Sequence, residues 1–176
     1  MIMELKNITH FNFNKKIINL IKVRCTKQLP VTKGLDKNIR NVNGHTLNFD
    51  TPTNLFYFNL IKNEIMKLYF HYKAKFPQIQ TQKLNQIDLL KYTVGGKYTT
   101  HVDQFTTLPR HLSIIINLNE DYEGGDLIFT DQKEEEIKKI KLKKGSVVFF
   151  PSNFMYPHKI KPIIKGTRYS IVAWLQ

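Results

Sequence analysis

Residues 92–103 read Tyr-Thr-Val-Gly-Gly-Lys-Tyr-Thr-Thr-His-Val-Asp. The paired glycines are typical of a turn, and the β-type residues on either side predict strands over 84–92 and 97–102. His101 and Asp103 stand at i and i+2 at the end of the second strand, and strand alternation puts such residues on the same face. An imidazole and a carboxylate that converge on one point predict two ligands of a metal site.

Short β-type runs continue to the end of the sequence. We predict six more strands, over 111–118, 126–130, 136–142, 146–150, 157–163 and 167–175. The connections are too short for crossover helices, so the strands are expected to pair antiparallel. This pattern predicts a sandwich or jelly roll with helices on one side, in the α+β class but mostly β.

The amino-terminal part predicts helices. Apolar residues at helical spacing indicate an amphipathic helix over 14–28. Thr51-Pro52 is a capping residue followed by proline at the first helical position, which predicts a longer helix through Tyr72. Residues 30–50 carry turn residues and are expected to form a loop with room for short strands. We expect one domain over 1–176, in which 1–82 form the helical support and substrate-loop region and 83–176 the β core with the metal site.

Length and composition exclude several classes of protein. A chain of 176 residues with 41% hydrophobic residues forms a folded core and is not mainly disordered. No apolar run has the roughly 18 residues of a membrane helix, and Met1–Lys6 lacks the start of a secretory signal. The single cysteine, Cys25, fits a reducing compartment and is expected to be a packed thiol. We expect a cytoplasmic protein without a membrane partner.

The formal net charge of +13 leaves the partner open. The amino-terminal half is the more basic one, and such a field favours an anionic partner such as nucleic acid. Most of the basic residues are lysines interleaved with Asn and Ile, which an A+T-rich coding sequence also produces without any binding function. Both interpretations remain open at this point.

Two residues near the carboxyl end complete the pattern that begins with His101 and Asp103. His158 starts a later predicted strand, and two histidines with one carboxylate form the facial triad of non-haem Fe(II) oxygenases. Arg168 follows ten positions later in a strand of mostly apolar residues. A guanidinium in that setting needs an anion, either a carboxylate ligand or a structural ion pair.

The order of these motifs resembles that of a known family. The motifs are Tyr92-x-x-Gly95-x-Lys97-Tyr98-x-x-His101-x-Asp103, Gly124-Gly125-Asp126-Leu127-Ile128-Phe129, His158, Gly166-x-Arg168 and Trp174. Together they resemble the prolyl 4-hydroxylase-like family of Fe(II)- and 2-oxoglutarate-dependent dioxygenases. The resemblance implies a double-stranded β-helix core. Residues 39–47 resemble the segment that precedes this core in the family, with Val42 where the family usually has Ser.

The resemblance implies a role for each matching residue. It implies iron ligands at His101, Asp103 and His158, which are also the catalytic residues. It implies 2-oxoglutarate contacts at Arg168, Tyr92, Ser113 and Trp174, where Ser113 replaces the usual Thr. It implies substrate contacts at Tyr98, Arg110 and Arg40. Asn117 falls where relatives often have Tyr, so one hydrogen bond at this position is expected to be replaced or lost.

The family also implies a reaction. We expect Fe(II), 2-oxoglutarate and O2 as cofactors, with ascorbate, and hydroxylation at C4 of proline in a peptide or protein. Residues 27–50 are a candidate mobile substrate loop, and a bacterial or viral origin is expected. The alternatives are a nucleic-acid oxygenase of the demethylase kind, a lysyl or free amino-acid hydroxylase of the same chemistry, and a non-catalytic module that binds a small molecule.

Overall fold

The computed structural model describes residues 1–31, 34–81, 83–104, 107 and 109–176. Two helices occur in these ranges, α1 (Phe11–Arg24) and α2 (Pro52–Lys75). The strands are β1 (Met3–Leu5), β2 (Lys27–Gln28), β3 (Arg40–Asn41), β4 (Asn43–Thr46), β5 (Leu84–Tyr92), β6 (Lys97–His101), β7 (Leu112–Asn117), β8 (Tyr122–Gly124), β9 (Leu127–Thr130), β10 (Glu136–Ile140), β11 (Val147–Pro151), β12 (His158–Ile160), β13 (Ile163–Gly166) and β14 (Arg168–Leu175).

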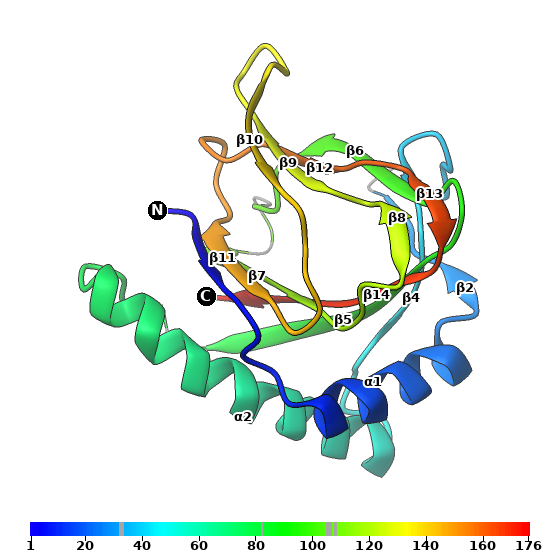
Figure 1. Ribbon diagram of the computed structural model, residues 1–176. Coiled ribbons are helices and arrows are strands. Elements are labelled where there is room, and N and C mark those ends of the chain that lie inside the picture. The colour runs from blue at the N-terminus through cyan, green and yellow to red at the C-terminus, as the bar shows by residue number, and fades with distance from the viewer. Residues whose placement is uncertain (32–33, 82, 105–106, 108) are drawn as a thin grey trace.

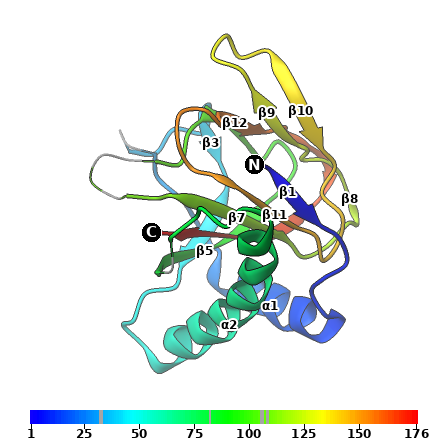
Figure 2. The same ribbon diagram turned by 90° about the vertical axis from the view of Figure 1, so that its left-hand side faces the viewer.

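Two larger sheets face each other. One has the order β1-β11-β7-β14-β5-β4-β2, the other the order β10-β9-β12-β6-β3, and β13 and β8 form a small pair at one end. The strand pairs are antiparallel, as predicted. Both helices lie on the same side of the molecule, against the larger sheet, while the β9–β10 hairpin projects from the opposite side (Figures 1 and 2). This is the double-stranded β-helix that the motifs implied.

Strand alternation divides the core into two layers. On β11, Val147 and Phe149 belong to the cluster between the sheet and the helices, whereas Val148 and Phe150 belong to the cluster between the two sheets. Tyr72 of α2 stacks on Phe149, with ring centroids 5.4 Å apart. Because β7 and β14 are covered on both faces, their sequences are almost continuously apolar and show little alternation.

The prediction for α2 is confirmed and the one for α1 needs correction. Thr51 caps α2, where its hydroxyl accepts a hydrogen bond from the backbone N–H of Asn54. The helix predicted over 14–28 instead spans Phe11–Arg24. It ends at Cys25 because Lys27 and Gln28 pair with β4 in the larger sheet, which a helical pattern cannot reveal.

The eight predicted strands are present with small changes at their ends, and the structure adds six short strands of two to four residues each. Two of them, β3 and β4, lie in the region 30–50, where short strands were allowed for, whereas β1, β2, β8 and β13 were not predicted. They are too short for a periodic signal, and each is defined by a partner distant in the sequence. The region 30–50 therefore contains β3 and β4, and residues 32–33 of this region lie outside the described residues.

Neither helix of the described chain combines the length and the apolar character that a membrane span requires. The cytoplasmic location stays a prediction.

Candidate active site

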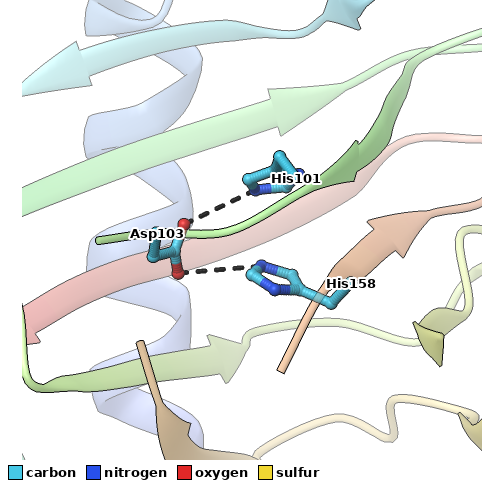
Figure 3. Close-up of side chains that lie close together, drawn as sticks. All are labelled: His101, Asp103 and His158. Carbon is cyan, nitrogen blue, oxygen red and sulfur yellow. Dashed lines mark ion pairs between the residues drawn. The ribbon is translucent and has the colours of Figure 1, made fainter. Parts of the chain in front are cut away.

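Two paired strands bring His101, Asp103 and His158 together. His101 ends β6, His158 begins β12, and the two histidines are direct partners in the antiparallel register of these strands. Asp103 follows β6 by two residues. One ligand atom from each of the three side chains lies within 4.8 Å of the others, and Figure 3 shows them pointing toward one another. The Asp103 oxygens lie 3.5 Å from His101 Nε2 and 3.6 Å from His158 Nε2.

The surroundings orient all three side chains. His101 Nδ1 lies 2.8 Å from the Thr99 carbonyl and His158 Nδ1 lies 3.1 Å from the Tyr156 carbonyl. A neutral imidazole that donates from Nδ1 presents the lone pair of Nε2, which is the form that a metal binds. The Ser113 hydroxyl donates to Asp103 Oδ2 at 2.7 Å. The three side chains are therefore arranged as ligands.

Electrostatics keep Asp103 and His158 in the protonation states that a metal requires. Burial alone would raise the pKa of Asp103, but the neighbouring His158 and His101 and the hydrogen bond from Ser113 hold that pKa well below its usual range. Burial and the nearby His101 lower the pKa of His158 to about 4. At neutral pH the site therefore offers a carboxylate and a neutral His158 imidazole.

Arg168 is buried at the start of β14, with 1% of its surface exposed. Its Nε donates to Asn117 Oδ1 at 3.0 Å, and the guanidinium lies 5.2 Å from the centre of the Tyr92 ring. Its Nη1 has no hydrogen-bond partner among the described residues. A buried cation with an unsatisfied donor is costly unless an anion is bound, so this position fits a carboxylate ligand.

Asn117, which stands where relatives often have Tyr, makes several hydrogen bonds beside Arg168. Its side-chain nitrogen donates to the Asn119 carbonyl at 2.6 Å, and its oxygen accepts from Arg168 and from the Tyr122 hydroxyl, the latter at 3.3 Å. The amide thus holds one edge of the guanidinium. Only the tertiary structure identifies Asn117 as the partner of Arg168. The sequence showed only that Asn stands where relatives often have Tyr.

One hollow collects most of the predicted site residues. It is lined by His101, Asp103, His158, Arg168, Tyr92, Tyr98, Trp174 and Arg40. Tyr98 stacks on His101 with ring centroids 3.6 Å apart, and the Arg40 guanidinium lies 4.9 Å from the centre of the Tyr98 ring. Ser113 lies behind Asp103 and does not line this hollow. Its role as a cosubstrate contact stays a prediction.

Arg110 lies on the open side of the site. It donates to the Asp103 carbonyl at 3.2 Å and to the Gln86 side chain at 2.9 Å, and it lies 3.7 Å above the Trp174 ring. Asp88 and Gln86 also face this side, and the sequence analysis did not single them out. The alternation of 84–92 was the signal that could have found them, because it places both on one face with Tyr92.

The profile of the 2OG-Fe(II) oxygenase superfamily matches residues 87–176, which is half of the chain and includes all three candidate ligands and Arg168. The chain belongs to this superfamily. Membership implies Fe(II), 2-oxoglutarate and O2 as the cofactors, and the His-Asp-His group fits the metal.

Curated relatives of this superfamily member are PKHD-type hydroxylases of bacteria. The one from Gloeothece citriformis is 31% identical over 104 residues, which cover 56% of this chain and 46% of the relative. The one from Herminiimonas arsenicoxydans is 33% identical over 96 residues, which cover 49% and 41%. The matched part thus spans about half the length of these relatives or less.

Solved structures share the fold over nearly the whole chain. A prolyl hydroxylase from Trichoplax adhaerens, in complex with a hypoxia inducible factor peptide fragment, superposes with a TM-score of 0.80 at 16% identity, covering 99% of this chain and 82% of that one. A prolyl-4-hydroxylase from Pseudomonas putida gives 0.79 at 16% identity, covering 99% and 92%. At this identity the likeness concerns the fold.

Proposed function

We propose that this oxygenase hydroxylates proline at C4 in a peptide or protein, with Fe(II), 2-oxoglutarate and O2, and with ascorbate to keep the iron reduced. We also propose that residues 1–176 act as one catalytic domain. The coverage of 99% of the chain by solved prolyl hydroxylases supports the single domain. The PKHD-type hydroxylase relatives support the reaction class.

One observation carries the proposal: three ligand side chains and a buried arginine with an unsatisfied donor line the same hollow. Two imidazoles and one carboxylate on one side of a metal are the donor set of non-haem Fe(II) oxygenases, and they leave positions open for a cosubstrate. His101, Asp103 and His158 would hold the iron. Arg168, held by Asn117 at one edge, would bind the distal carboxylate of 2-oxoglutarate.

The bound iron would supply the oxidation, in which 2-oxoglutarate and O2 are converted to succinate and CO2 while one oxygen atom enters a C–H bond of the substrate. The chain's own residues orient the reactants and exclude water. Tyr92 and Trp174 would line the cosubstrate pocket, with Ser113 orienting Asp103 from behind. Tyr98, Arg40 and Arg110 would face the peptide on the open side.

The test measures succinate formed from 2-oxoglutarate by purified protein with Fe(II), ascorbate and air, with and without proline-rich peptides. The same samples are analysed by mass spectrometry. We expect succinate formation and a gain of one oxygen atom on proline. His101→Ala and Asp103→Ala should lose iron and retain less than about one hundredth of the turnover, because residues that bind the metal directly matter more than the residues that orient them, whose loss costs about 10–100-fold.

His71→Ala is the matched control, since it removes an exposed imidazole of α2 far from the ligands along the chain. Full activity in His101→Ala or Asp103→Ala would disprove the metal site. Succinate without a mass gain on peptide would keep the cofactors and redirect the search to nucleic acid or free amino acids. Iron-loaded protein that makes no succinate would favour the binding-module alternative.

A further inference from the structure

An open trough leads outward from the candidate iron site. Its inner hollow has a volume of about 380 Å³ and is lined by His101 and Asp103 as well as by Asp88. An outer hollow of about 360 Å³ continues from it, and both hollows are lined by Thr46, Gln86, Arg110 and Trp174. Each is in the size range of small-ligand pockets. The two hollows adjoin, because they share these four lining residues.

Strand register places Asp88 within this trough. Alternation points Gln86, Asp88, Leu90 and Tyr92 of β5 to the same face. Gln86 and Asp88 line the inner hollow of the trough, and Leu90 and Tyr92 line the hollow at the iron ligands. Asp88 pairs with Val172 of β14, which pairs in turn with Ile115 of β7.

The residues paired across the same three strands two positions before Asp88 lie next to the iron site. They run from Gln86 through Trp174 to Ser113, whose hydroxyl holds Asp103. Asp88 is on β5, and β14 lies between β5 and β7. The distance across the sheet from Asp88 to β7 is therefore two strand spacings, or about 10 Å. Asp88 is therefore within a few residues' reach of the oxidised position along an extended peptide.

Asp88 is a buried carboxylate without a cation of its own. Only 4% of its surface is exposed. Its Oδ1 accepts hydrogen bonds from the Thr46 hydroxyl at 2.8 Å and from the Gln86 amide at 3.0 Å, and both donors are neutral. Among the described residues, no ion pair within 4.0 Å includes Asp88. A buried carboxylate is costly unless a positive charge balances it.

The two arginines of the inner hollow have other partners. Arg110 donates to the Asp103 carbonyl and to Gln86 and lies on the Trp174 ring. Arg40 donates to the Pro30 carbonyl at 3.1 Å and lies on the Tyr98 ring. The charge of Arg110 interacts with Asp88 at longer range, and Arg40 Nε has no hydrogen-bond partner among the described residues. Neither guanidinium forms an ion pair with Asp88 within 4.0 Å in the described part of the chain. A cation that enters the trough from outside would give Asp88 the close ion pair that the described residues do not supply.

We propose that Asp88 determines specificity by binding a positively charged side chain, Lys or Arg, within about two residues of the oxidised proline. The peptide nature of the ligand rests on the proposed function, whereas the preference for positive charge rests on Asp88 alone. The preference is a short-range one, because the chain's net charge of +13 repels cationic peptides at a distance. Because Asp88 is buried, salt weakens the preference less than it weakens a surface interaction.

The first experiment measures binding without turnover. Trp174 is the single tryptophan of the chain and lines both hollows, so its fluorescence reports a peptide in the trough. Protein with Fe(II) and 2-oxoglutarate is kept free of O2 and titrated with three peptides that differ only in Lys, Ala or Glu flanking one proline. We expect the Lys peptide to bind at least tenfold more tightly than the Ala peptide, and the Glu peptide most weakly.

The variants separate Asp88 from the general field. Asp88→Asn keeps the shape of the side chain and should abolish the preference for Lys while the Ala peptide binds as before. Glu123→Gln is the matched control, because it also removes one negative charge, at an exposed position of β8, and should keep the preference. Equal binding of the three peptides by the wild type, or an unchanged preference in Asp88→Asn, would overturn the proposal.

Turnover with the same peptides distinguishes this proposal from the proposed function. Hydroxylation of all three peptides at equal kcat/KM would refute the role of Asp88 and leave the prolyl hydroxylase intact. Binding that depends on Lys and on Asp88, but without hydroxylation of proline, would support the cation site and refute the proline reaction.

Discussion

Arg168 illustrates how a single residue acquires a function from its neighbours. Its guanidinium is buried, yet one edge is fixed by Asn117 and Nη1 is left without a partner in the described part of the chain. The side chain of Asn117 is itself held in place, because its Nδ2 donates to three backbone carbonyls. A guanidinium fixed in this way can meet a carboxylate without losing further side-chain freedom.

This arrangement predicts different effects for two substitutions. Arg168→Ala should raise the KM for 2-oxoglutarate by about a hundredfold, because truncating one partner of a buried charge pair costs about 2–5 kcal/mol. Asn117→Ala should raise it by about tenfold, since one hydrogen bond to a charged group is lost. Succinate assays at varied 2-oxoglutarate give both values, and iron content should stay unchanged. If KM were the same in Arg168→Ala as in the wild type, the residue would have no part in binding the cosubstrate.

At the scale of elements, the β8–β13 pair depends on Gly124. Gly124 ends β8 and pairs with Ile163 of β13. It has φ +81°, and a Cβ at this position would collide with the backbone carbonyl of Pro162. This small sheet precedes Arg168 directly, so its geometry bears on where β14 begins.

Gly124→Ala is therefore expected to lower the free energy of unfolding by about 2–4 kcal/mol, from positive-φ strain together with the collision. Gly34→Ala is the matched control. Gly34 also has a positive φ, of +108°, but nothing lies within 4 Å of its added Cβ, so only the strain of about 1 kcal/mol should remain. Urea unfolding measures both values. Equal losses in the two variants would show that the collision at Pro162 is relieved at no cost.

At the scale of the whole molecule, the core between the helices and the larger sheet excludes water from Cys25. This thiol is 1% exposed and donates to the Leu89 carbonyl at 3.3 Å. Burial raises its pKa to about 12. The sequence-based expectation of a packed thiol is confirmed, because the side chain belongs to the buried cluster.

The raised pKa predicts that stability falls at alkaline pH. In the unfolded chain the thiol ionises near pH 9, whereas in the folded protein it stays protonated to about pH 12. The unfolded state therefore binds fewer protons across this window, and the free energy of unfolding decreases as the pH rises. Between pH 8 and 10 the wild type should lose about 1 kcal/mol more than Cys25→Ala. Urea unfolding at both pH values measures the difference, and parallel losses would contradict the prediction.

Much of the candidate site could be predicted because its signals are local. His101 and Asp103 are two positions apart, and the turn at Gly95-Gly96 orients β6, which ends at His101 just before Asp103. The cap at Thr51 likewise determined where α2 begins. Such features depend on neighbours within a few residues, so they can be predicted from composition and periodicity.

The remaining features depend on partners far apart in the sequence. Only the tertiary structure pairs His158 with His101, joins Asn117 to Arg168 across 51 positions, and buries Asp88 beside the trough. The short strands β1 to β4 exist for the same reason, since each is defined by the strand it pairs with. The sequence alone determined the types of element and the ligand chemistry. Strand register and burial decided which side chains meet. The free energies of strand pairing and of burial arise from contacts between residues that are far apart in the sequence.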